Sequence, residues 1–238
     1  MPRKRKKKKR RKLPPLDYDP QKYDWVNTRE GGYPRRKKGT VKPVKLNNTL
    51  QKNVELTRPT NEAAKRVMAK LYPFLQYLKL GRTVVRIAGR FKKSINKNGQ
   101  MDYTSLEGLD FQDDYRLADT AWGLVSVREK AGVLYLLFPV GNMHVKKHSS
   151  LATGYYVEFI LLSGSPEKEN VLRIDSTESR LYTFEEEGNV DCHLSMQLPE
   201  KEPWMALLKV SCTFEKEVAD TPKYYGLKVV KVGKGQNS

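Results

Sequence analysis

The residues of this sequence whose type and spacing most clearly indicate a chemical role are basic ones, which can bind phosphate. Ten of them fall within the first twelve positions. A lysine or arginine that neutralises a phosphate releases a condensed counterion, so such a run binds nucleic acid without reading its sequence. The run contains no acidic residue and no apolar residue before Leu13, so it repels itself and cannot enter a core. We expect a disordered arm that orders on a polyanion, made of Arg3, Lys4, Arg5, Lys6, Lys7, Lys8, Lys9, Arg10, Arg11 and Lys12.

Two further groups of basic residues extend this cationic character along the chain. One is the consecutive set Arg35, Arg36, Lys37 and Lys38. The other is Arg82, Arg86 and Arg90, in a stretch, RTVVRIAGRFKK, that is compatible with a strand or a helix. In a strand, alternation would place these three arginines on one face, where they either bind phosphate or stay solvated.

The charge of the whole chain is divided unevenly. Residues 1–45 hold 18 basic and four acidic side chains, and residues 46–93 hold 11 basic and two acidic ones. Residues 94–238 hold 16 basic and 21 acidic side chains, so the net charge of +18 hides a cationic front and a mildly anionic remainder. This asymmetry indicates a binding end and a body with another task.

Four aromatic residues lie in the proline- and glycine-rich segment 13–34. They are Tyr18, Tyr23, Trp25 and Tyr33. Three interpretations remain open: the rings pack on the protein itself, stack on nucleic-acid bases, or dock on a protein partner. The neighbouring Asp17, Asp19 and Asp24 argue mildly against a path lined by phosphates.

Residues that could support a metal site or catalysis occur without a convincing pattern. His144 and His148 sit in a glycine- and serine-containing loop, and Cys192 and His193 lie in an expected strand. A nuclease would hold magnesium with clustered carboxylates, for which the nearest candidates are Asp110, Asp113, Asp114 and Asp119. Solvated side chains explain both groups more simply, and no glycine-rich phosphate loop is present. We predict no enzyme activity, no cofactor and no metal.

The compartment follows from what the sequence lacks. Two cysteines cannot make a disulfide framework and fit a reducing environment. No apolar run follows the basic N-terminus and no stretch of about 18 apolar residues exists, so we expect neither a secretory signal nor a transmembrane segment. We predict a cytoplasmic protein, associated with nucleoid or ribosome or carried in a phage particle.

The elements that must position these residues form one helix and a β region. Apolar residues recur at helical spacing from Ala64 to Leu78, with Thr60 as the expected N-cap and Pro73 as a kink. Beyond Asn98, short β-rich runs at 122–127, 133–138, 155–162, 180–184, 192–198, 204–214 and 224–232 alternate with turn clusters. This pattern predicts a mainly β (α+β) fold with an antiparallel β-sandwich-like body. Residues 1–54 would be a basic, largely disordered arm and linker, and residues 55–238 the helix and β domain.

The order of these pieces resembles a family of uncharacterised proteins from Bacteroidetes. The matching stretches are RPTNEAAKRVMAKLYPFL (58–75), MDYTSLEGLDF (101–111), WMALLKVSCTF (204–214) and YYGLKVVKV (224–232), so the resemblance covers about residues 55–232. It implies a helix followed by a sandwich-type β region, and it implies nothing about chemistry. The family pattern has a short glycine-rich N-terminus where this chain has its polybasic run.

Two functions fit these observations. The first is a non-enzymatic nucleic-acid-associated protein whose arm binds phosphates, with RNA slightly favoured over DNA because charge is combined with spaced aromatics. Its β domain would dock on a larger assembly. The second is a structural or adaptor protein of a bacterial or phage assembly, in which the β domain makes the protein contacts. An anionic membrane is a less favoured partner, because the arm has no lipidation motif or apolar helix face.

Overall fold

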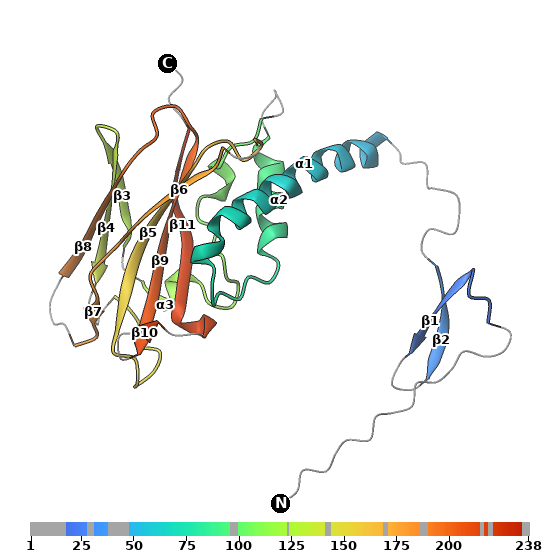
Figure 1. Cartoon of the computed structure of the whole chain (residues 1–238), viewed down its shortest axis with the longest axis horizontal. Helices are drawn as coiled ribbons and strands as arrows, with labels where there is room; N and C mark the ends of the chain where they lie inside the picture. The colour runs from blue at the N-terminus through green and yellow to red at the C-terminus, as the bar shows by residue number, and fades with distance from the viewer. Residues whose placement is uncertain are drawn as a thin grey trace, which may run out of the picture. The chain divides into compact units, whose positions relative to one another are not determined.

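The computed structural model describes residues 18–27, 31–37, 48–95, 100–122, 124–140, 144–168, 171–185, 190–214, 217–218 and 221–234. It is mainly β, with three antiparallel sheets and a few helices, which confirms the predicted class (Figure 1). The chain divides into two compact units, residues 1–51 and 52–238. We call residues 52–238 the body.

The first unit contains a β-hairpin that the sequence analysis did not predict. Strand β1 (Tyr23–Asn27) pairs antiparallel with β2 (Gly32–Arg36), and Trp25 lies opposite Pro34. These described residues therefore form a hairpin within the segment that the sequence analysis expected to be largely disordered. A side chain at position 32 would require the Trp25 indole to move, because a Cβ there would lie 2.4 Å from its atoms.

The body contains two of the three sheets. A three-stranded sheet has the order β3 (Ser126–Lys130), β4 (Val133–Val140), β8 (Val190–Gln197). In the six-stranded sheet, four strands follow in the order β10 (Glu217–Val218), β9 (Trp204–Phe214), β5 (Gly154–Ser163) and β6 (Arg173–Glu178). Strand β11 (Tyr225–Gly233) also pairs with β9, and β7 (Tyr182–Thr183) also pairs with β5. Strand β6 was not expected, because RIDSTE lacks an apolar alternation.

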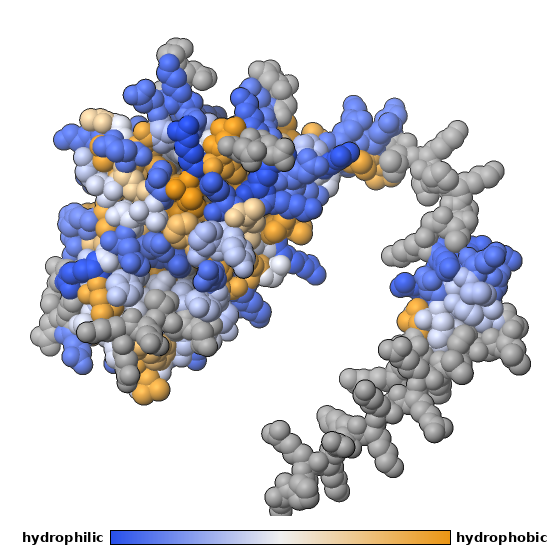
Figure 2. All heavy atoms as spheres, in the orientation of Figure 1, coloured by the Kyte–Doolittle hydropathy of each residue, from blue (hydrophilic) through white to orange (hydrophobic). Residues whose placement is uncertain are grey.

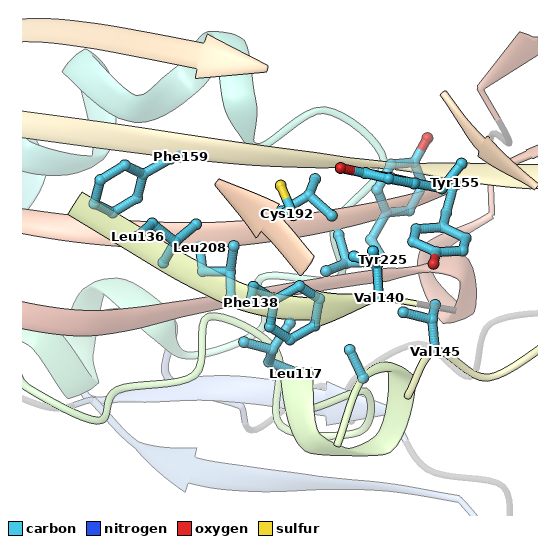
Figure 3. Packing of buried hydrophobic residues seen from close by; sticks show 14 of the residues in the cluster. Leu117, Leu136, Phe138, Val140, Val145, Tyr155, Phe159, Cys192, Leu208 and Tyr225 are labelled. Carbon is cyan, nitrogen blue, oxygen red and sulfur yellow. The ribbon is translucent and has the colours of Figure 1, made fainter. Parts of the chain in front are cut away.

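The two sheets share one hydrophobic core. Alternate residues of β4, including Leu136 and Phe138, are buried in the same cluster as Phe159 of β5 and Leu208 of β9. Figure 3 shows these side chains gathered around the buried thiol of Cys192. Face-to-face burial of this kind is the arrangement that a sandwich-like body requires.

Helices cover the other face of the six-stranded sheet. Helix α1 (Asn48–Leu71), the 3₁₀ turn η1 (Tyr72–Phe74) and α2 (Thr83–Ser94) bury residues such as Val67 and Phe91 in a second cluster. Ile160 of β5 and Leu207 of β9 belong to the same cluster. The central strands are therefore buried on both faces, and the body has three layers, which lie side by side in Figure 1. Short elements η2 (Thr104–Leu106), α3 (Leu117–Thr120) and η3 (Pro222–Tyr224) complete it.

The sequence predicts one kinked helix, but the described residues form two long helices, α1 and α2, and α1 differs from its prediction at both ends. Helix α1 begins at Asn48 rather than near Thr60, and Pro59 lies inside it. Thr60 is not an N-cap: its side chain is buried, and its hydroxyl donates to the carbonyl of Leu56 at 2.9 Å. Pro73 does not kink a helix that continues to Leu78: α1 ends at Leu71, and Pro73 sits in the η1 turn, where its missing backbone donor is tolerated.

Candidate nucleic-acid interface

One face of the β1–β2 hairpin is basic. The backbone N–H of Lys37 donates to the carbonyl of Lys22 at 3.0 Å, so these two residues continue the ladder beyond the paired strands. Directly paired residues project to the same side, and alternation therefore places Lys22, Lys37, Arg35 and Tyr33 on one face. Arg35 is exposed and the Tyr33 side chain is 50% exposed. We call these four residues the basic hairpin face.

Two acidic residues moderate the charge of this face. Asp24 lies opposite Arg35 in the ladder. Asp19 pairs with Lys22 at 3.5 Å, and the pKa of its carboxyl is lowered, first by the backbone N–H of Gln21 and then by Lys22. Three basic residues against two acidic ones leave this part of the hairpin with a small net positive charge.

The aromatic residues of this segment divide between packing and exposure. Tyr18 contacts the Trp25 ring edge-to-face, with centroids 5.7 Å apart, and its hydroxyl donates to the carbonyl of Tyr23 at 2.5 Å. Trp25 also covers Gly32. Tyr18 and Trp25 thus pack on the hairpin itself, which was one of the three interpretations, while the half-exposed Tyr33 keeps a free ring surface.

The three arginines of the second basic group lie on a helix. Arg82 is the exposed N-cap residue of α2, and Arg86 and Arg90 follow at intervals of four. Arg86 donates to the carbonyl of Asp110 at 2.8 Å and pairs with Asp113 at 2.6 Å. Arg90 donates to the carbonyls of Ser105 and Glu107 at 2.9 and 3.0 Å. Arg86 and Arg90 therefore fasten α2 to the following loop, and only Arg82 remains suited to a phosphate.

The predicted binding residue Arg36 is exposed on β2 opposite Tyr23, on the other face of the hairpin from Arg35. The remaining predicted binding residues lie outside the described residues. They are the ten basic residues at positions 3–12 and Lys38.

The acidic residues considered for magnesium serve separate structural contacts. Asp113 pairs with Arg86, and Asp114 pairs with Lys79 at 2.5 Å. Asp110 accepts from the backbone N–H of Leu117 at 2.9 Å, and Asp119 accepts from that of Arg116 at 3.1 Å. Across the part of the chain that the structure describes, no group of three histidine, cysteine or acidic residues could hold a metal ion.

Of the histidine and cysteine candidates, His148 and both cysteines have structural surroundings that explain them. His148 meets the ring of Tyr224 edge-on at 6.2 Å, and burial, followed by Lys146 and Lys223, lowers the pKa of its imidazole. Burial raises the pKa of both thiols, that of Cys212 to about 12. Because only the thiolate is strongly nucleophilic, neither cysteine is suited to catalysis.

A hollow on the outer face of the three-stranded sheet was not predicted. It has a volume of about 380 Å³ and is lined by Ser126, Arg128, Tyr135, Leu137, His193 and Ser195, with parts of Leu136 and Leu194. We call the first six residues the sheet hollow. The signal in the sequence was the alternation of polar and apolar residues in β8, where His193 and Ser195 are separated by Leu194. Only the strand pairing brings the three strands together.

The rest of the described surface is largely polar on the face shown in Figure 2, with small hydrophobic areas between hydrophilic side chains. On α1, Val54 and Leu56 are 55% and 39% exposed. Among the described helices, none has the length and apolar character needed to cross a membrane.

Comparisons with known proteins add no relative. No protein-family model matches the chain, no curated protein is significantly similar to it, and no solved structure matches it. The resemblance to the Bacteroidetes family therefore stays a prediction.

Proposed function

We propose that this chain is a non-enzymatic nucleic-acid-associated protein that binds phosphates through its N-terminal basic residues. The observation that carries the proposal is the concentration of charge at one end of the sequence, a net +23 over residues 1–93. Within the described residues, Arg35 and Lys37 lie beside the half-exposed Tyr33 on the basic hairpin face. A two-stranded ribbon of this kind fits a nucleic-acid groove, and an exposed tyrosine fits an unpaired base. RNA is slightly favoured for that reason.

In this proposal, the polybasic run at positions 3–12 supplies the affinity and the hairpin gives the contact a fixed shape. Contacts to phosphate orient a protein without selecting a sequence. The sandwich-like body, which is net negative beyond residue 93, then docks on a larger assembly. We place this activity in the cytoplasm, on a nucleoid, a ribosome or a packaged phage genome.

The test is a salt titration of binding to duplex DNA and to single-stranded RNA. The full-length chain is compared with a variant lacking residues 1–17, which keeps the hairpin. If all ten basic residues of the run contact phosphate, they contribute a log–log slope of about −9 on duplex DNA and about −7 on single strands. Removing them should reduce the slope by that amount.

A length-matched variant with the ten basic residues replaced by serine is the control for the loss of chain length. It should behave like the shortened chain. Binding by neither the full-length chain nor its variants would contradict the proposal.

The alternative function is an adaptor whose β domain contacts a protein, with the arm as an anchor. The exposed Val54 and Leu56 on α1 favour it modestly. The two functions differ in what the chain retains without residues 1–17. If the chain is an adaptor, the shortened chain still binds its protein partner although it no longer binds nucleic acid. If the chain is a nucleic-acid-associated protein, the shortened chain loses its location in the cell.

A further inference from the structure

The sheet hollow lies across three strands whose register brings its residues into rows. Arg128 of β3 and Ser195 of β8 flank Tyr135 of β4 directly across the ladder. In the next row, Ser126 and His193 flank Leu137 in the same way. Tyr135 and Leu137 therefore form an apolar floor on the central strand, and polar side chains border it on both sides.

The side chains of the hollow are open to solvent. The Tyr135 side chain is 45% exposed, and Arg128 and His193 are exposed as well. Within the described residues, no carboxylate lies within ion-pair distance of Arg128. A half-exposed ring, next to a guanidinium that has no carboxylate partner among the described residues, is suited to a flat ligand that carries a negative group.

We propose that the sheet hollow binds one unpaired base of a single-stranded nucleic acid, stacked on Tyr135, with an adjacent phosphate at Arg128. The inference rests on the proposed function and specifies which form of nucleic acid the body prefers. In a duplex, each base is covered by its neighbours, so only an unpaired base offers a face to an aromatic side chain. The volume of about 380 Å³ falls within the range of small-molecule sites, roughly 300–1,000 Å³.

Each residue of the hollow has a role in this arrangement. The ring of Tyr135 covers the base irrespective of its identity, because every base has a π-face. The guanidinium of Arg128 donates to phosphate oxygens, and the hydroxyls of Ser126 and Ser195 and the imidazole of His193 reach polar atoms at the base edge or sugar. The site therefore prefers single strands over duplexes without reading a particular sequence.

The experiment measures the affinity of the full-length protein for a labelled single-stranded RNA of about 15 nucleotides, within the usual span of single-strand sites. A blunt duplex of the same sequence is measured in parallel by fluorescence anisotropy. The variant Tyr135→Ala should weaken single-strand binding by about 5- to 100-fold, the usual effect of losing one stacked base. Duplex binding should stay within about twofold of the wild type, since the arm supplies it.

Two variants separate stacking from general damage. Tyr135→Phe keeps the ring and should bind single strands within about twofold of the wild type. Tyr72→Ala removes a ring that is 68% exposed but lies in η1, outside the hollow, and should change nothing. Arg128→Gln should weaken single-strand binding and also lower its salt slope by about 0.7.

The outcomes distinguish the inference from the function on which it rests. If Tyr135→Ala binds single strands as the wild type does, while the salt slope of the arm persists, the hollow is not the site and the proposed function stands. If the free mononucleotide competes as well as the single strand does, the occupant is a nucleotide and the inference is overturned. If the wild type binds neither nucleic acid, both fail together.

Discussion

Glu158 on β5 and Lys209 on β9 are cross-strand partners whose charged groups lie 3.0 Å apart. Their side chains are only 16% and 14% exposed, and the Lys209 ammonium also lies 5.9 Å from the ring centre of Phe74. Burial of two charges removes hydration from both, so their mutual attraction mainly offsets that loss. The pair therefore matters most when one partner is missing.

We expect Lys209→Met to destabilise the body by about 3 kcal/mol, because Glu158 would be left with an uncompensated charge. The carboxyl of Glu178 should add to this loss of stability. Its pKa is already raised by burial and by the nearby Glu158, and Lys209→Met would remove the positive charge that opposes this rise. Denaturant titration measures the change in free energy of unfolding.

The control is the double variant Lys209→Met with Glu158→Leu, which removes both charges. It should lie within about 1 kcal/mol of the wild type or exceed it. Equal loss of stability in the single and double variants would mean that packing, and not the unpaired carboxylate, is responsible.

His148 predicts how stability responds to acid. Burial and the positive charges of Lys146 and Lys223 lower the pKa of its imidazole below the ordinary value of 6.5. As the pH falls below about 6.5, the unfolded chain binds a proton that the folded chain still excludes, so this group makes folding less favourable. The loss grows until the pH passes the lowered pKa of the folded state.

We expect His148→Gln to lose less stability than the wild type when the pH is lowered from neutral to about 5. Denaturant titrations at several pH values measure this difference. An unchanged pH dependence in His148→Gln would refute the assignment.

At the scale of elements, prediction from the sequence succeeded where burial imposes a period on the residues. Strand β9 has the expected bounds, because a strand buried on both faces reads as one apolar run. The segment that follows Gly81 could not be assigned, because its β-branched residues fit a strand and its spacing fits a helix. Tertiary packing decides: the segment is helical, and Ile87, Ala88 and Phe91 are buried in the core beside the six-stranded sheet.

Besides β6, the start of α1 and the β1–β2 hairpin were missed because nothing periodic marks them. The first three turns of α1 are exposed at every described position, so they have no apolar stripe to detect. The β1–β2 hairpin is held by Trp25 lying over Gly32, which is a contact across the turn and not an alternation along the strand. Short exposed elements of this kind depend on a few specific contacts.

Glycines offer a test of element packing. Gly226 on β11 faces α3, and a Cβ built on it would lie 2.8 Å from the Cα of Leu117. Gly226→Ala should therefore destabilise the body by about 1–3 kcal/mol, because backbone atoms of α3 would have to move.

Gly89 is the matched control in the interior of α2, where a Cβ meets nothing within 4 Å. Gly89→Ala should stabilise the protein by about 0.5–1 kcal/mol through helix propensity alone. Thermal unfolding of the two variants measures both effects, and a loss of stability in Gly89→Ala would show that the helix surface there is covered.

For the whole molecule, the candidate binding residues differ in how far sequence could identify them. The basic run at positions 3–12 is a matter of composition and needs no fold. The roles of Arg86 and Arg90 could not be read from spacing, because their partners are backbone carbonyls of a later loop. The sheet hollow required the pairing of β4 with β8, residues more than fifty positions apart.

The salt dependence of binding by the whole molecule also tests the basic hairpin face. If the basic hairpin face contacts nucleic acid together with the arm, its charges count in the salt dependence as the arm charges do. Replacing Arg35 and Lys37 by glutamine should lower the slope by about 1.8 on duplex DNA and by about 1.4 on single strands.

The control variant replaces Lys201 and Lys231, which are exposed lysines of the body, and removes the same charge from the whole chain. If binding depended only on net charge, both double variants would weaken it alike. A smaller slope in the hairpin variant alone would mean that position matters, because a counterion is released only where a side chain meets a phosphate. An unchanged slope in both would confine the contact to the polybasic run.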